Sequence, residues 1–412
     1  MTGMKILFLT PQVPYPPQQG TALRNWGLIA GLAARHQVSL LTFAAQPFQP
    51  APALAAACAR IETVEQPVRT LSRRLRDLLL TRQPDMALRL ASPLFRQRLA
   101  AWLQRESFDI VHIEGIELAP YLDLLEAARP RPFLLFDNHN CEYLLQKRAC
   151  LTDLRHPLRW HGAAYSFVQW QRLHRYEAQV CRRADHVLAV SAADAAALRA
   201  LAPGLSPTVI PNGLHLSAYA PDTPPAPGMG QQAIVFTGKM DYRPNVDAVL
   251  WFARQVLPRI RQQIPQAHLW IVGQRPHRRL DPLRADPAIT LTGQVESPQP
   301  FIAGAAVYVV PMRMGGGTRL KVLEAMAMER AVVATRLGAE GFPVTDGQEL
   351  LLADEPEAFA EAVVSLLRDP QRRAELGRVA RAFVQAHYDW SVLIPRLESI
   401  YPRKSQPLAP SG

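Results

Sequence analysis

The sequence is poor in cysteine and lacks several motifs that would point to a particular chemistry. Its four cysteines form no C-x-x-C pair and show no Cys/His ligand spacing, so we expect buried, free thiols in a reducing compartment. Neither G-x-x-x-x-G-K-[ST] nor G-x-G-x-x-G occurs, which removes the main support for a kinase, an ATPase or a nicotinamide-dependent oxidoreductase. D-x-D, an acidic pair that commonly holds a divalent ion against a diphosphate, is also missing. We therefore expect no metal cofactor.

Long apolar runs are missing as well. No stretch of 18 apolar residues occurs, so the sequence predicts no membrane-spanning helix. The first apolar run ends at Leu9, which is too short for a signal peptide and predicts a buried first strand. These features favour a cytoplasmic protein.

Length and composition favour two globular domains. A chain of 412 residues exceeds what one core usually supports, and 48% hydrophobic with 20% charged residues is ordinary for a folded protein. Of the net charge of +11, residues 1–215 carry +8 (24 basic minus 16 acidic) and the remainder +3 (22 minus 19). Only five of the 46 basic residues are lysine, so a lysine inside a motif is informative.

Short apolar runs alternate with helix-period segments along the whole chain. Being mostly apolar rather than alternating, they are typical of parallel strands buried on both faces. In the first half they are Lys5–Thr10, Val38–Phe43, Ile110–Ile113, Phe133–Phe136, Val187–Val190 and Thr208–Pro211. In the second half they are Ala233–Thr237, His268–Val272, Ile289–Thr292, Val307–Pro311 and Ala331–Thr335.

This alternation predicts an α/β fold with two Rossmann-like domains and a ligand cleft between them, at the carboxyl ends of both sheets. A Pro/Gly cluster at Tyr219–Gly230 has no periodicity and is typical of a linker. We expect an N-terminal domain over 1–215, a linker over 216–231 and a C-terminal domain over 232–386. The segment 387–412 would form a helix that returns to the first domain, followed by a frayed tail.

A glycine triplet (Gly315, Gly316, Gly317) follows the run that ends at Pro311, and a helical pattern begins near Thr318. Glycines let backbone N–H groups approach an anion, and the start of a helix favours negative charge. Arg319 and Lys321 add positive charge suited to a diphosphate. Glu324 is suited to accept hydrogen bonds from a ribose diol. The alternative is an ordinary helix that begins after a loop.

The segment G-G-G-T-R-L-K-V-L-E-A-M-A resembles the nucleotide-sugar motif of glycosyltransferase family 4, retaining enzymes of the GT-B fold. Further segments are similar to the family in the same order along the chain. They are Pro17-Gln-Gln-Gly20, Ile210-Pro-Asn-Gly213, Phe236-Thr-Gly-Lys239, His268-Leu-Trp-Ile-Val-Gly273 and His387-Tyr-Asp-Trp390. The resemblance covers nearly the whole chain.

The resemblance implies a role for several residues. Glu324 would bind the ribose, while Lys239, and Lys321 with Arg319, would bind the diphosphate. The backbone of Gly316, Gly317 and Thr318 would meet the phosphates or the donor sugar. Gly20 would lie in a loop that approaches the diphosphate and the acceptor, and Gly213 near the crossover between domains. Arg243 is a further candidate cation, and Lys239 could instead be an exposed residue after a strand.

One position departs from the family pattern. The family's first glutamate, which contacts the donor sugar, would fall eight residues before Glu324, where this chain has Gly316. Backbone amides could replace the missing carboxylate. The departure also leaves open a sugar-nucleotide-binding protein without transferase activity.

A second informative segment is Phe133-Leu-Leu-Phe-Asp-Asn-His-Asn-Cys-Glu142, in which an apolar strand ends in polar side chains. In the family a histidine at this strand end lies near the reacting sugar, and His139 matches that position. His112 lies at another strand end and is its main rival. Glu142 is either a polar ligand or a first-turn helix residue, and either histidine could instead be structural.

The third feature is basic. Arg69–Arg105 carries nine arginines and two acidic residues interleaved with leucines, and Arg148–Arg183 adds aromatic residues that include Trp160, Tyr165, Phe167 and Trp170. Such a surface could rest on anionic lipid at the inner membrane face, or it could be an ordinary solvated helix face. Nucleic-acid binding is not expected, because no recognition module accompanies the charge.

Together these features predict a metal-independent, retaining glycosyltransferase. It would move a hexose from a nucleotide sugar to a glycan or lipid-linked acceptor in exopolysaccharide or cell-envelope synthesis, with the diphosphate as leaving group. The alternatives are a non-catalytic sugar-nucleotide-binding protein and a nucleotide-sugar epimerase of the same fold.

Overall fold

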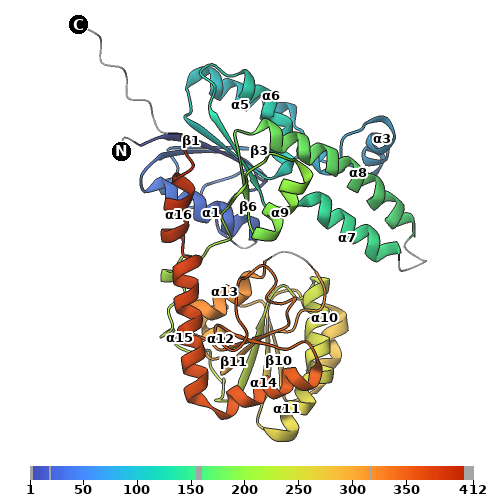
Figure 1. Ribbon diagram of the computed structural model, residues 1–412, viewed down its shortest axis with the longest axis vertical. Coiled ribbons are helices and arrows are strands. Elements are labelled where there is room, and N and C mark those ends of the chain that lie inside the picture. Colours follow the sequence, from blue (N-terminus) through green and yellow to red (C-terminus); the bar gives the residue numbers. More distant parts are fainter. Residues whose placement is uncertain (1–2, 18–19, 155–159, 316–317, 403–412) are drawn as a thin grey trace. The chain divides into compact units, whose positions relative to one another are not determined.

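A computed structural model describes residues 3–17, 20–154, 160–315 and 318–402 (Figure 1). The chain divides into two compact units. The first unit comprises Met1–Asn212 with Leu393–Gly412, and the second comprises Gly213–Val392. Among the described residues, no helix is long and apolar enough to cross a bilayer.

The first unit is built on a seven-stranded parallel sheet with the order β3-β2-β1-β4-β5-β6-β7. Its strands are β1 (Lys5–Thr10), β2 (Gln37–Phe43), β3 (Arg60–Val64), β4 (Ile110–Glu114), β5 (Phe133–Asn138), β6 (His186–Ala189) and β7 (Thr208–Val209). Its helices are α1 (Gly20–Ala33), α2 (Pro52–Ala57), α3 (Leu71–Leu80), α4 (Asp85–Arg89), α5 (Pro93–Arg105), the 3₁₀ helix η1 (Ile116–Tyr121), α6 (Leu122–Ala127), α7 (Glu142–Leu154), α8 (Trp160–Arg183) and α9 (Ala192–Leu201).

The second unit repeats this design with six parallel strands in the order β10-β9-β8-β11-β12-β13. Its strands are β8 (Ala233–Thr237), β9 (His268–Val272), β10 (Ile289–Gly293), β11 (Val307–Val310), β12 (Val332–Ala334) and β13 (Leu351–Leu352). Its helices are η3 (Leu216–Ala218), α10 (Arg243–Trp251), the π-helical η4 (Phe252–Val256), α11 (Leu257–Gln263), η5 (Arg278–Ala285), α12 (Gln299–Ala303), α13 (Leu320–Ala327), α14 (Pro356–Arg368) and α15 (Pro370–His387). The final helix α16 (Trp390–Glu398) enters the first unit at Leu393.

The predicted α/β class with parallel sheets is therefore confirmed. In both units the strand order reverses beside the first strand, between β1 and β4 and between β8 and β11. Ligands of doubly wound sheets bind at the carboxyl ends of the strands at such a switch point. The side chains that follow β4, β5, β8 and β11 are therefore the first to consider for function.

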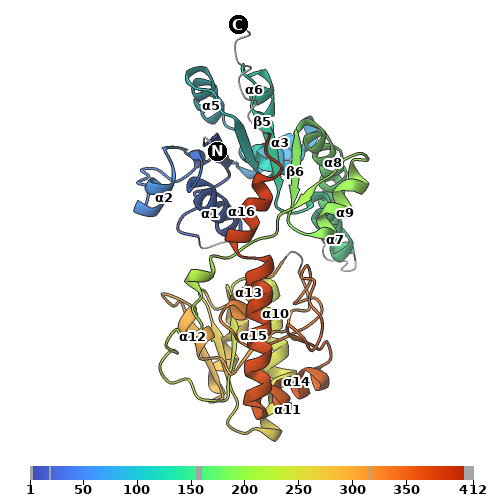
Figure 2. The same ribbon diagram turned by 60° about the vertical axis from the view of Figure 1, so that its left-hand side comes forward.

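Helix α16 packs on the first unit beside α1 (Figure 2). A Cβ added at Gly31 would lie 2.4 Å from Ile394, so a glycine is needed there for α16 to approach α1. Glu398 pairs with His36 at 2.9 Å and with Arg35 at 2.8 Å. The helix is thus held by both apolar contact and charge.

The Pro/Gly-rich segment interpreted as a linker lies within the second unit. Tyr219 and Ala226 are buried, and the Ala226 N–H donates to the Pro300 carbonyl at 2.9 Å. The four cysteines are buried and free, as predicted.

Candidate functional site

In the second unit, strand β11 leads through the glycine triplet into α13. Gly315 has a φ of +99°, a left-handed conformation that glycine adopts without strain. The proposed ligands Gly316 and Gly317 lie outside the described residues. Helix α13 begins at Leu320, close to the predicted start. Its N-terminus, which carries the partial positive charge of a helix start, lies next to the switch point between β8 and β11.

Lys321 brings an ammonium group to the end of β8. Its Nζ donates to Asn245 Oδ1 at 3.0 Å and lies 4.0 Å from the centre of the Phe236 ring. Asn245 in turn donates to the Lys239 carbonyl at 2.9 Å, which keeps its oxygen turned toward Lys321. A Cβ at Gly238 would lie 2.8 Å from Lys321 Nζ, so a larger residue there would displace the ammonium.

The surroundings of Lys321 change its protonation. Desolvation of the ammonium lowers the pKa of Lys321 to about 7, with Arg319 lowering it further and Glu324 opposing the shift. An anion beside Nζ would favour the charged form. The amine is thus poised to gain a proton when a negatively charged ligand binds.

Glu324 lies one turn after Lys321 on α13, and both side chains are partly exposed. Its Oε1 accepts a hydrogen bond from the Tyr219 hydroxyl at 3.1 Å. Burial raises the pKa of Glu324, and the Tyr219 hydrogen bond and the Lys321 charge oppose that shift. An acceptor carboxylate is therefore held in a fixed place beside a cation.

The other predicted donor-site residues are placed as follows. Arg319 is buried at the start of α13, where burial lowers its pKa, and a Cβ at Gly315 would lie 3.2 Å from its Nη2. Thr318 is partly exposed just before it. Lys239 is partly exposed directly after β8, and Arg243 is exposed at the first position of α10. Lys321 and Glu324 thus lie on α13 and Arg319 directly precedes it, whereas Lys239 and Arg243 follow β8.

In the first unit, a cluster of charged groups lies where β4 and β5 end. His139 Nε2 lies 3.0 Å from Glu114 Oε2 and 3.9 Å from Asp137 Oδ2. Asp137 and Glu114 are fully buried, whereas the His139 side chain remains 13% exposed. Burial alone would lower the pKa of His139, but the Glu114 hydrogen bond and the Asp137 charge outweigh it and raise the pKa. His139 is thus the member of the cluster that a substrate can reach.

Arg24 supplies the buried cation of this cluster. Its Nε and Nη2 donate to the two Asp137 carboxylate oxygens at 2.7 and 2.8 Å. Its Nη1 also donates to the Ile210 carbonyl at 2.8 Å and to Asn212 Oδ1 at 3.3 Å. Helix α1 is thereby joined to β5 and to the segment after β7.

His112 has a different role from His139. It is fully buried, stacks on Phe8 at a ring-centre distance of 4.3 Å, and places Nε2 2.8 Å from the Tyr401 hydroxyl. Its Nδ1 lies 3.2 Å from Glu114 Oε1. His112 therefore orients the carboxylate that contacts His139, and the geometry favours His139 of the two.

The loop that carries His139 is fixed by a buried carboxylate from α8. Glu177 accepts hydrogen bonds from Asn138 Nδ2 at 2.8 Å and from the backbone N–H groups of Glu142 and Tyr143 at 3.0 and 2.9 Å. Burial raises the pKa of Glu177 to about 7, and burial with the Glu177 charge raises that of Glu142 to about 7. Glu142 itself opens α7.

Glu114, Asp137 and His139 present ligand-type atoms within 4.8 Å of one another. Both Asp137 oxygens, however, already accept from Arg24, and each Glu114 oxygen faces a histidine. The Arg24 guanidinium thus already supplies the positive charge that a metal ion would bring to these carboxylates. Within the described residues, this set fits an internal ion-pair network better than a metal site.

Sequence reasoning missed Arg24, Glu114, Tyr219, Asn245 and Glu177. Arg24 lies within an otherwise ordinary helical pattern, and Tyr219 begins the Pro/Gly cluster. Glu114 carried a usable signal, because it ends a buried strand at the expected edge of the sheet. The other four become visible only through contacts with residues far away in the chain.

Two family models match the chain. Residues 19–213 match the glycosyl transferase 4-like domain, and residues 231–369 match glycosyl transferases group 1. Together they cover most of both units.

Curated relatives include several phosphatidyl-myo-inositol mannosyltransferases. The protein from Mycolicibacterium smegmatis is 33% identical over 201 residues, which is 47% of this chain and 50% of the relative. The one from Propionibacterium freudenreichii is 26% identical over 321 residues, 76% of this chain and 75% of the relative. The chain thus spans about half the length of the first of these relatives and three quarters of the other.

Solved structures share the fold across both units. HepE of Anabaena in complex with UDP and glucose superposes with a TM-score of 0.65 at 16% identity, covering 96% of this chain and 98% of HepE. Sucrose-phosphate synthase of Thermosynechococcus elongatus gives a TM-score of 0.68 at 19% identity, covering 97% and 98%. At this identity the likeness concerns the fold, which is that of GT-B enzymes.

Proposed function

Because the chain belongs to glycosyltransferase family 4, we propose that it transfers a hexose from a nucleoside diphosphate sugar to a glycan or lipid-linked acceptor. We further propose that the reaction retains the anomeric configuration, needs no metal, and serves polysaccharide or cell-envelope synthesis in the cytoplasm. The observation that carries the proposal is that Lys321 and Glu324 lie together on one helix at the switch point of the second sheet.

The donor fits these groups by charge. The diphosphate would lie against the N-terminal turn of α13, Lys321 and Arg319, which together provide N–H donors and two cations. The ribose hydroxyls would donate to Glu324, which Tyr219 holds in place. The mannosyltransferase and HepE matches favour a nucleotide-sugar donor.

The same cations would serve the chemistry. When the bond between sugar and diphosphate breaks, negative charge grows on the departing diphosphate. Lys321 and Arg319 would stabilise that charge without the reorganisation that solvent water requires. A cation supplied by the chain in this way replaces the divalent ion of metal-dependent transferases.

In the first unit we propose that His139 hydrogen-bonds to the substrate. Glu114 is held ionised by its hydrogen bonds with His112 and His139, which keep the pKa of its carboxyl well below the usual range despite burial. Because a carboxylate only accepts, Nε2 of His139 must donate to Glu114. The raised pKa of His139 then favours the form that also carries a proton on Nδ1, from which it can donate to a substrate oxygen.

The test is a thermal-shift screen of UDP, GDP and ADP sugars in EDTA, on wild type and Glu324→Ala. Ligand that binds only the native state raises the melting temperature. A shift with one nucleotide that is lost in Glu324→Ala and kept in the exposed control Glu361→Ala supports the donor site and identifies the base. If no nucleotide shifts the wild type, the donor-site assignment fails.

Turnover is tested separately by following release of nucleoside diphosphate with glycan and lipid-linked acceptors. Metal-independent release that requires acceptor, and is lost in His139→Ala, supports transfer. Donor binding without release would instead favour a sugar-nucleotide-binding protein, in line with Gly316 at the position of the family's first glutamate. Release without acceptor, together with an isomerised sugar, would indicate an epimerase.

A further inference from the structure

Helix α3 and the segment just before it expose a set of large apolar side chains that nothing in the described chain covers. They are Val68, Leu71, Leu75, Leu79 and Leu80, each 57–82% exposed. We call these five residues the α3 apolar surface. Leu71, Leu75 and Leu79 follow one another at intervals of four and therefore lie along one side of the helix.

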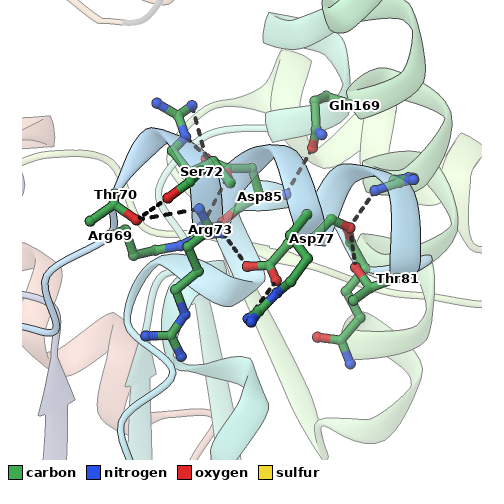
Figure 3. A network of polar contacts seen from close by, with 12 residues as sticks. Arg69, Thr70, Ser72, Arg73, Asp77, Thr81, Asp85 and Gln169 are labelled. Carbon is green, nitrogen blue, oxygen red and sulfur yellow. Dashed lines mark hydrogen bonds and ion pairs between the residues drawn. The ribbon is translucent and has the colours of Figure 1, made fainter.

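An ordinary amphipathic surface helix packs its apolar side against the protein. In α3 it is the polar side that contacts the protein, and the apolar side faces outward. Arg69 donates to Asp77 on α3 at 2.8 Å and to the Asp85 side chain at 2.9 Å, and Arg74 reaches Asp85 at 3.3 Å (Figure 3). No residue of α3 is buried. A helix that served only to cover a core would turn its leucines inward.

Residues of α8 make further polar contacts that hold α3 in this orientation. Gln169 accepts from the Asp85 N–H at 2.8 Å (Figure 3). Arg172 donates to the Leu78 carbonyl at 2.6 Å. Thr70 caps the start of the helix by accepting from the Arg73 N–H at 3.3 Å. Turning the leucines inward would break this set of contacts, so they are held outward.

The charge around the α3 apolar surface is positive. The only two acidic residues between Arg69 and Arg105 are Asp77 and Asp85, and both are engaged by arginines. Arg73 and Arg76 remain exposed on the same helix. Outward leucines flanked by arginines are the composition of a helix that lies in a membrane interface.

We propose that α3 docks the protein on an anionic lipid bilayer, with the leucines entering the acyl boundary and the arginines meeting the phosphates. Charge complementarity favours this occupant over a second copy of the chain. Two copies joined through α3 would bring the exposed arginines of both into contact, where like charges repel. A bilayer of anionic lipid supplies the opposite charge along the whole helix.

This inference goes beyond sugar transfer and does not depend on it. Binding is measured with the full chain and no donor, by sedimentation with vesicles of phosphatidylcholine alone or with phosphatidylglycerol added. We expect binding that rises with the anionic lipid and falls with salt. The triple variant Leu71→Gln, Leu75→Gln, Leu79→Gln should bind at least ~1,000-fold more weakly, since each leucine transfer contributes about tenfold or more.

Glutamine keeps the helix propensity of α3, so the variant should fold, and a circular dichroism melt checks this. A matched control is Val379→Gln with Val392→Gln, which changes exposed apolar residues elsewhere. The control should bind vesicles like the wild type. Arg73→Gln with Arg76→Gln should lose most of the dependence on anionic lipid.

Three outcomes would overturn the proposal. One is a wild type that does not bind anionic vesicles. Another is a folded leucine variant that binds as well as the control. The third is a wild-type dimer in light scattering that the leucine variant abolishes, without vesicle binding, which would make the α3 apolar surface an interface between copies. None of these bears on nucleotide binding, so the two proposals fail separately.

Discussion

Nucleotide binding should depend on pH through Lys321. In the free protein, desolvation lowers the pKa of this lysine to about 7, so half of it is uncharged near neutral pH. A bound diphosphate stabilises the ammonium and raises the pKa. Binding therefore takes up a proton, and affinity must fall as the pH rises above 7.

The magnitude can be worked out from the pKa. If only the charged form binds, the apparent Kd is multiplied by one plus ten to the power of the difference between pH and pKa. With a pKa of about 7, this factor is about 2 at pH 7 and about 33 at pH 8.5. The Kd should thus rise about 16-fold between the two pH values. Phosphate groups, with a second pKa of about 6, are already ionised over this range.

The assay is isothermal titration calorimetry with UDP and GDP at both pH values. Repeating it in buffers of different ionisation enthalpy measures the protons taken up directly. Lys321→Met should bind weakly at both pH values, with no proton uptake and a flat pH profile. Lys147→Met, a lysine of the first unit, should keep the wild-type profile. The reasoning is refuted if the wild-type Kd is the same at both pH values, or if Lys321→Met retains the slope.

Three further predictions concern other residues of the site. Burial raises the pKa of Glu177 to about 7, so the free energy of unfolding should fall by about 3 kcal/mol as the pH rises from about 4.5 to 7. Urea unfolding of Glu177→Gln should lack that share of the pH dependence, and an unchanged profile would contradict it. Arg24→Met should cost about 3–5 kcal/mol of stability by leaving Asp137 unpaired. The double variant with Asp137→Leu should be more stable than Arg24→Met in urea, and a less stable double variant would count against the argument. Tyr219→Phe should weaken nucleotide binding about tenfold in calorimetry by releasing Glu324, and unaltered affinity would show that the hydrogen bond is dispensable.

The sheets were largely predictable because their strands are buried on both faces. Parallel strands covered by helices have apolar sequences, and every such run overlaps a strand in the structure. The two strands that were missed are edge strands, β3 and β13. Arg60–Val64 includes Glu62 and Thr63 and therefore contains no continuous apolar run. Leu351–Leu352 is too short to show a pattern.

The site was predictable only where its residues lie in local patterns. Lys321, Glu324 and His139 each come after a buried strand, and the direction of a parallel strand places the residues beyond its carboxyl end at the ligand edge. Arg24 and Tyr219 could not be found in this way. Their partners Asp137 and Glu324 lie 113 and 105 residues away, and such pairings come from the folded chain, not from periodicity.

The charges of the two clusters indicate which unit binds the diphosphate. In the first unit the Arg24 charge is balanced by Asp137, and Glu114 leaves the cluster neutral or negative, depending on His139. Such a cluster offers no net positive charge to a diphosphate and suits hydroxyl groups instead. In the second unit Arg319 and Lys321 outnumber Glu324 on α13, and the helix start adds partial positive charge. Although both sheets have the same switch point, an anionic donor should therefore bind to the second unit, which leaves the neutral acceptor hydroxyl to His139.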